Sequence, residues 1–225
     1  MTSKKLIAGL VLAASAAGAQ ADTVLSESFN DVAGLTASGW VQANNSTAPV
    51  GTSWFQGNSG IFAAASGAAD AYVAANFLGT SNATGAISNW LFTPVLTLDA
   101  SSIVSFLART AGDGFLDRVE VRFSANGAST DVGATASSVG DFSSLLGSFQ
   151  ASSSTGWVNL SYSLFGLDVP TTGRLAFRYV VSNVATAGNY IGIDDMAVTA
   201  VPEPTTYGLM GLGVAALLLR RRFTA

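Results

Sequence analysis

The chain has 225 residues, with ten Lys and Arg residues, fourteen Asp and Glu residues, and a formal net charge of -4 at pH 7. It contains no cysteine and no histidine, which excludes disulfide bonds, a Ser-His-Asp triad and the usual zinc sites. Any catalysis would depend on carboxylates, so we expect a protein that is not an enzyme. An acidic surface repels phosphates, so we expect no nucleic acid partner.

The N-terminal segment has the pattern of a secretory signal peptide. Two lysines precede an apolar stretch over residues 6–19, and Ala19 and Ala21 form an A-x-A cleavage site. This stretch is too short to favour a membrane-spanning helix. We therefore expect removal of residues 1–21 and an exported chain that begins at Asp22.

The central segment, residues 22–200, is long enough for one domain with a substantial core. It holds five arginines, no lysine and thirteen acidic residues, so its net charge is about −8. Such a surface suits divalent cations or neutral glycans.

Several parts of the central segment alternate apolar and polar residues with a period of two, the pattern of half-buried strands. In the first of them, Leu25, Glu27 and Phe29 share one face. Further predicted strands cover residues 105–109, 119–124, 157–162, 175–180 and 190–198. In the last strand, Asp194 is expected on the face of Met196 and Val198, and Asp195 on the face of Ile193.

No long segment of the domain has the 3.6-residue period of a helix. Residues 125–156 are rich in serine and glycine and could form either one short helix around 142–149 or a long loop. Strands separated by turn-rich loops predict an all-β fold, a two-sheet antiparallel jelly-roll sandwich. We expect the four tryptophans, Trp40, Trp54, Trp90 and Trp157, to pack in the core or on a sheet, with a sugar-stacking role open for one of them.

The C-terminal residues combine a short motif, an apolar run and a basic end. Pro202, Glu203 and Pro204 precede the apolar residues 207–219, and Arg220, Arg221 and Arg222 follow. About 13 helical residues span about 20 Å, less than the bilayer core of about 30 Å. The arginines would hold their end on the cytoplasmic side.

This tail resembles the PEP-CTERM sorting signal of bacteria. The resemblance implies transient membrane anchoring, cleavage near Pro202–Pro204 by an exosortase, and release or transfer to the cell surface. An ordinary tail anchor is the second interpretation, and a soluble core helix is the third, because buried arginines would be costly.

A second set of motifs runs in order through the domain. These are Glu27–Asn30, Gly39-Trp40, Ser53-Trp54, Asn89–Pro94, Asp117–Ser124, Trp157, Phe177-Arg178 and Tyr190–Met196. In this order they resemble the choice-of-anchor J family, a jelly-roll relative of cleaved-adhesin and MAM domains. The resemblance implies a surface or secreted jelly roll without an enzyme activity of its own.

A carboxylate on an apolar strand face needs a partner, which an arginine or a metal ion could supply. Jelly-roll relatives often hold a structural Ca²⁺ between the first and last strands. On this resemblance Glu27 and Asp194 or Asp195 would be ligands, with Asp70 and Asn30 as further candidates. The alternative is a Glu27–Arg178 salt bridge, with both aspartates capping a strand end.

The sequence therefore predicts an exported, non-enzymatic bacterial surface or matrix protein in three parts: a signal peptide (1–21), a jelly-roll domain (22–200) and a sorting segment (201–225). Its expected partners are an exosortase and extracellular polysaccharide or surface components, with a role in adhesion or biofilm association. One alternative is a carbohydrate-binding module with a defined glycan site. Another is a carboxylate-dependent glycan-active enzyme that uses Asp113 and Asp117.

Overall fold

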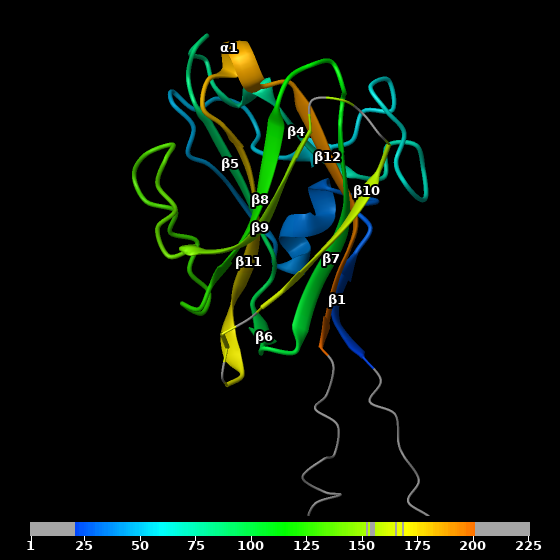
Figure 1. Cartoon of the computed structure of the whole chain (residues 1–225), viewed down its shortest axis with the longest axis vertical. Coiled ribbons are helices and arrows are strands. Elements are labelled where there is room, and N and C mark those ends of the chain that lie inside the picture. The colour runs from blue at the N-terminus through cyan, green and yellow to red at the C-terminus, as the bar shows by residue number, and fades with distance from the viewer. Residues whose placement is uncertain (1–20, 152, 154–155, 165, 168, 201–225) are drawn as a thin grey trace, which may run out of the picture. The chain divides into compact units, whose positions relative to one another are not determined.

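The chain folds as a sandwich of two antiparallel β-sheets, which confirms the predicted all-β class (Figure 1). A computed structural model describes residues 21–151, 153, 156–164, 166–167 and 169–200. The predicted signal peptide, apart from Ala21, and the predicted sorting segment lie outside these residues. In the described part of the chain, no helix has the length and apolar character needed to cross a membrane.

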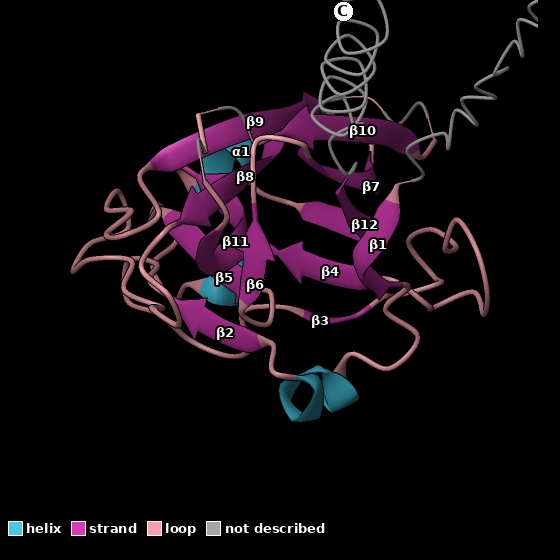
Figure 2. Ribbon diagram, turned by 90° about the horizontal axis from the view of Figure 1, so that it is seen from below, coloured by secondary structure: helices cyan, strands magenta, loops and turns pink. Residues whose placement is uncertain are grey.

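Each sheet has six strands, and the two sheets form separate layers (Figure 2). The first, named here the β12 sheet, runs β10-β7-β12-β4-β3, with β1 paired to β12. Its strands are β1 (Asp22–Glu27), β3 (Phe55–Gln56), β4 (Val73–Asn76), β7 (Ser102–Thr110), β10 (Val158–Ser163) and β12 (Tyr190–Ala200). The first and last strands are therefore neighbours, as the predicted jelly roll requires.

The second sheet, named here the β11 sheet, runs β2-β5-β11-β8-β9, with β6 paired to β11. Its strands are β2 (Val41–Asn44), β5 (Ile87–Phe92), β6 (Leu96–Leu98), β8 (Asp117–Ser124), β9 (Ser144–Ala151) and β11 (Thr171–Val181). The helices of the described residues are short: two 3-10 turns, η1 (Ala33–Ser38) and η2 (Phe77–Gly79), and α1 (Val184–Ala187).

The main core fills the space between the sheets. Strand β7 alternates buried and half-buried residues, and its buried Phe106 packs edge-on against Phe177 of β11, with ring centroids 5.0 Å apart. Trp40 and Trp54 also lie in this core. The period-two alternation thus forms strands because one face of each is removed from water.

Loops cover the outer face of each sheet. Residues 125–143, named here the β11 cover, bring Val132 and Phe142 onto Trp90 and Phe92 of β5. Residues 57–71, named here the β12 cover, bring Phe62 onto Tyr190 of β12. Strand β5 is consequently buried along its whole length, and simple alternation is lost there.

The region left open as a short helix or a long loop contains a strand. Residues 144–151 form β9, which pairs antiparallel with β8 from Asp117↔Ala151 to Phe123↔Ser144. The helix around residues 142–149 was a wrong interpretation, whereas the loop interpretation holds for residues 125–143. The edge of β8 offers backbone hydrogen bonds that a weak helical pattern does not outweigh.

Residues 21–201 form one compact unit, which contains all the strands named above and the core between them. A protein of residues 22–200 therefore contains all the described strands and the core between them, and it is the suitable protein for experiments on this domain.

Candidate functional site

A β-bulge interrupts the last strand at Asp194 and Asp195. Asp194 is opposite Leu107, but the next pair is Ala197 with Ser105, so two residues of β12 oppose one residue of β7. Asp195 has a φ of 45°, in the left-handed region. The simple alternation of the strand therefore ends at Asp194 and is broken at Asp195.

The bulge inverts which residues face the core. Ile191 and Ile193 pack in the core before it, and Met196 and Val198 pack there after it. The predictions that Asp194 shares the face of Met196 and that Asp195 shares the face of Ile193 are therefore wrong. Period-two reasoning fails here because an extra residue shifts every later side chain to the other face.

The β12 cover supplies hydrogen-bond donors to both aspartates. Asp194 Oδ2 accepts from the N–H groups of Ala65 at 2.9 Å and Ser66 at 3.3 Å, and its Oδ1 accepts from Asp195 N–H at 2.7 Å. Ser66 Oγ donates to Asp195 Oδ1 at 2.9 Å. Asp194 is fully buried, and this burial raises the pKa of its carboxyl despite the backbone donors.

The other predicted ligands lie on neighbouring segments. Glu27 ends β1 opposite Met196, and its Oε1 accepts from Phe29 N–H at 2.8 Å. Asn30 Oδ1 lies against Gly67, 3.1 Å from where a Cβ would be. The carbonyl oxygen of Asp70 accepts from Gln56 Nε2, which also binds the carbonyl of Phe29.

These segments meet at the end of β1, but their carboxylates do not form a complete ligand set. In the described residues, no group of three or more Asp and Glu side chains is arranged to hold a metal ion. A calcium ion here would need carbonyl or amide oxygens as well, which Ca²⁺ accepts as ligands.

The alternative partner for Glu27 is wrong. Arg178 belongs to β11, in the other sheet, and forms an ion pair with Glu120 at 3.2 Å. Every ion pair among the residues that the structure describes involves Glu120. The carboxylates near the bulge thus have hydrogen-bond donors there but no arginine.

Asp117 holds strands together and is fully buried. Its Oδ1 accepts from Tyr179 Oη at 2.5 Å and Asn189 N–H at 2.8 Å, and its Oδ2 accepts from Tyr190 N–H at 3.1 Å. Burial raises the pKa of Asp117, although these donors lower it. Asp113 is exposed and accepts from Asn189 Nδ2. A substrate cannot lie between these two carboxylates while Asp117 is enclosed.

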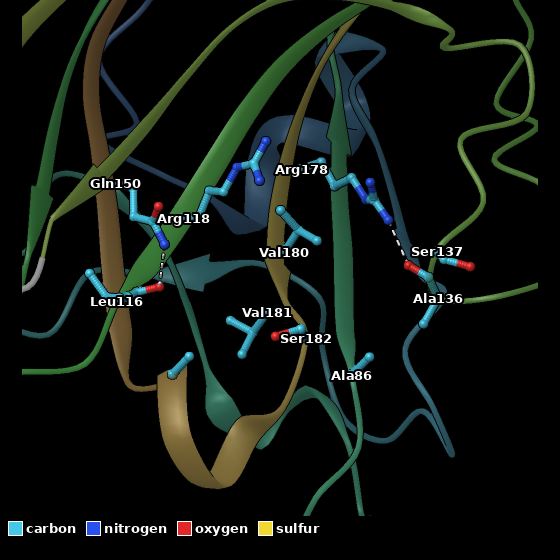
Figure 3. Close-up of a pocket in the computed structure, with 11 residues that line it drawn as sticks. Ala86, Leu116, Arg118, Ala136, Ser137, Gln150, Arg178, Val180, Val181 and Ser182 are labelled. Carbon is cyan, nitrogen blue, oxygen red and sulfur yellow. Dashed lines mark hydrogen bonds between the residues drawn. The ribbon is translucent and has the colours of Figure 1, made fainter.

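A pocket of about 480 Å³, named here the arginine pocket, opens beside the end of β11 (Figure 3). Arg118 and Arg178 line it, together with the neutral polar Ser137, Gln150 and Ser182 and the apolar Ala86, Leu116, Ala136, Val180, Val181 and Ala187. The described residues of its lining are cationic, neutral polar or apolar, and none of them is acidic.

Three arginines beside this pocket share one carboxylate. Glu120 Oε1 pairs with Arg118 Nη2 at 2.7 Å, and Oε2 pairs with Arg122 Nε at 2.7 Å and Arg178 Nη1 at 3.2 Å. Burial alone would raise the pKa of Glu120, but the hydrogen bond from Arg122 and the three positive charges hold it below its usual value. Arg118, Glu120 and Arg122 share one face of β8 by the period of two, a signal that the sequence carries, whereas Arg178 joins them only through the pairing of β8 with β11.

The tryptophans pack as predicted. Trp40 and Trp54 lie in the main core, and Trp90 lies under the β11 cover, with the Arg178 guanidinium 5.0 Å from its ring centroid. Trp157 packs on the outer face of the β12 sheet and donates to the carbonyl of Ala63 at 3.0 Å. Their positions support structural roles for all four.

Comparisons with known proteins identify a motif in the C-terminal segment and similar structures for the domain. Residues 200–222 carry a PEP-CTERM protein-sorting motif. No curated protein sequence matches the chain significantly.

Solved structures that are similar to this chain include cleaved adhesin domains of Lys-gingipain from Porphyromonas gingivalis W83. The K1 domain has a TM-score of 0.52 and 20% identity, covering 78% of this chain and 97% of that domain. The K3 domain has a TM-score of 0.51 and 22% identity, covering 80% of this chain and 99% of that domain. At this identity the likeness establishes a cleaved-adhesin-like fold.

Proposed function

We propose that the protein is a non-catalytic component of the bacterial surface or matrix that contributes to adhesion by binding extracellular polysaccharide. The PEP-CTERM motif carries this proposal, because it implies export and sorting to the surface or the extracellular space. An exosortase is then the processing partner, with residues 201–225 as a transient membrane anchor. Association with exopolysaccharide in a biofilm is the role that we infer for the sorted domain.

Two features of the domain favour binding over catalysis. The described lining of the arginine pocket consists of hydrogen-bonding and apolar side chains without a carboxylate, which suits a bound glycan better than its hydrolysis. The carboxylate pair available for glycosidase chemistry includes Asp117, which is fully buried. A carbohydrate-binding module is therefore the nearest alternative, and a glycan-active enzyme ranks below it.

The direct test is co-sedimentation of residues 22–200 with insoluble extracellular polysaccharide from cells that carry an exosortase. We expect the folded domain to sediment with the polysaccharide, and an acidic globular protein of similar size to stay in solution. Glycosidase, esterase and peptidase assays on the same sample should read background. Absence of binding would contradict the polysaccharide role, and turnover lost in Asp113→Asn would contradict the absence of catalysis.

Processing gives a separate prediction. Mass spectrometry of the protein recovered from the cell surface or medium should find an N-terminus at Asp22 and no peptide containing Arg220–Arg222, because both signals would have been cut away. In cells without the exosortase, the C-terminal peptide should remain. Recovery of an intact C-terminus from wild-type surface material would contradict the sorting pathway.

We also propose that calcium stabilises the end of β1. The support is the convergence of Glu27, Asn30 and Asp70 near the bulge, and carboxylate oxygens that have no arginine partner there. Glu27 and Asp195 are the best candidate ligands, since each uses one oxygen in a described hydrogen bond and retains the other. Asp194 already accepts three backbone donors and would mainly hold the bulge.

Excess calcium should raise the melting temperature of residues 22–200 by about 5–10 °C. At a hundredfold excess over Kd, binding to the folded state alone contributes about 2.7 kcal/mol, and about 2–4 °C accompanies each kcal/mol in a domain of this size. Scanning calorimetry with calcium, magnesium and chelator measures the shift. Magnesium should raise the melting temperature much less than calcium.

Two variants test the site. Glu27→Gln should abolish the calcium-dependent shift, and Asp22→Asn on the same strand should retain it. Identical melting temperatures in calcium and in chelator would refute the site.

A further inference from the structure

The arginine cluster reverses the local sign of charge on an acidic domain. Arg118, Arg122 and Arg178 surround Glu120, whereas the domain as a whole carries five arginines and thirteen acidic residues. Three positive charges against one negative charge leave an excess of two at one edge of the arginine pocket. Such an excess in a concave site attracts anions.

Two of the three arginines are each held by more than one partner. Arg178 donates to Ser88 Oγ at 2.9 Å, Glu120 Oε2 at 3.2 Å and the carbonyl of Ala136 at 2.6 Å, and its side chain is 5% exposed. Arg122 donates to Glu120 and to the carbonyl of Phe142. These residues hold the pocket wall and the β11 cover in place.

Arg118 is different because it has fewer described partners and reaches solvent. Its side chain is 37% exposed, and Glu120 is its partner among the described residues. Its Nε is buried without a hydrogen-bond partner there. A guanidinium has five N–H donors in a planar fork that matches the two oxygens of a carboxylate. Figure 3 shows the Arg118 and Arg178 guanidinium groups on either side of Val180.

The remaining lining fits a sugar ring. Ser137, Ser182 and Gln150 present neutral hydrogen-bonding groups, and Val180 and the half-exposed Leu116 present apolar surface. Sugar hydroxyls bind to the hydrogen-bonding groups, and the C–H faces of a sugar ring pack on the apolar surface. The pocket volume of about 480 Å³ lies in the usual range for small ligands.

We propose that the arginine pocket binds an acidic sugar residue, with Arg118 holding its carboxylate. This deepens the proposed polysaccharide binding by naming the sugar class and the anchoring side chain. The acidic remainder of the domain repels a polyanion that runs close to its surface, whereas a single uronate in the pocket does not feel the distant carboxylates, because their field is screened beyond about 8 Å at physiological salt. The pocket therefore selects isolated uronate residues within an otherwise neutral glycan.

The test compares small probes that differ only in charge. NMR titration of residues 22–200 should show that methyl β-D-glucuronoside binds at least tenfold more tightly than methyl β-D-glucoside. Arg118→Gln should remove this preference. Arg109→Gln makes the same change of charge on β7, in the other sheet, and should leave the preference intact. Melting curves of both variants establish that they are folded.

Results other than these would refute either the uronate site, the role of the carboxylate or the proposed function. Equal affinities for the two glycosides, no binding of either, or a preference that survives Arg118→Gln would refute the uronate site. Tighter binding of glucose 6-sulfate than of the glucuronoside would refute the carboxylate assignment. If the polysaccharide sediments with the Arg118→Gln variant as well as with the wild type, this inference fails and the proposed function stands. If the domain binds the glucuronoside but does not sediment with the polysaccharide, the proposed function fails and the uronate site stands.

Discussion

Replacing Glu120 with alanine should lower the free energy of unfolding by about 3–5 kcal/mol, because it removes the counter-charge from a buried ion-pair cluster. The Glu120 and Arg178 side chains are each 5% exposed, and that of Arg122 is 11% exposed. Without the carboxylate, two poorly hydrated guanidinium groups would lie close together unpaired. Urea unfolding followed by tryptophan fluorescence measures the loss.

The matched control is Arg118→Ala, which removes the partner that is 37% exposed. Exposed ion pairs contribute at most about 1 kcal/mol, so this variant should lose far less stability than Glu120→Ala. Equal losses in the two variants would contradict the buried-cluster account.

The pH dependence of this effect has a definite sign. The pKa of Glu120 is lowered in the folded state, so its contribution is present above the ordinary glutamate value of about 4.3 and is lost as pH falls further. The difference in unfolding free energy between wild type and Glu120→Ala should therefore shrink on acidification below about pH 4. A difference that grows on acidification would contradict the assignment.

Asp117→Ala should also cost about 3–5 kcal/mol. It leaves three donors without their acceptor, the Tyr179 hydroxyl and the backbone N–H groups of Asn189 and Tyr190. Each buried donor left unsatisfied costs about 1–3 kcal/mol. These donors join β11 and the start of β12 to β8, so the loss should reduce the cooperative unfolding of both sheets. Urea unfolding again provides the measurement.

Asp113→Ala is the control for Asp117, since it removes an exposed carboxylate that also interacts with Asn189. Its cost should stay within about 0.5 kcal/mol. The pH trend should be opposite to that of Glu120. Burial raises the pKa of Asp117, so the pH-dependent part of its contribution is fully present below the ordinary aspartate value of about 3.9 and is lost as pH rises through the folded-state pKa. A loss in Asp117→Ala that is smaller at pH 3 than at pH 7 would contradict this sign.

The sequence by itself determined the all-β class and the sorting motif. Alternation such as that of Val119, Val121 and Phe123 reports a half-buried strand locally, because successive side chains point to opposite faces. The sorting motif is likewise a continuous run of residues, at 200–222. The sequence also singles out Glu27 and Asp194 as carboxylates in apolar strands, although the face that it assigns to Asp194 is wrong.

Only the tertiary structure decided where those carboxylates point and which charges meet. The bulge at Asp194 depends on the register of β12 against β7, and β9 depends on the free edge of β8. Glu120 meets Arg178 because β8 and β11 pair, although 58 residues separate them in sequence. Periodicity places Arg118, Glu120 and Arg122 on one face of β8, but register, bulges and contacts between strands are set by the neighbouring strand. Only the fold therefore adds Arg178 to this cluster and forms the arginine pocket.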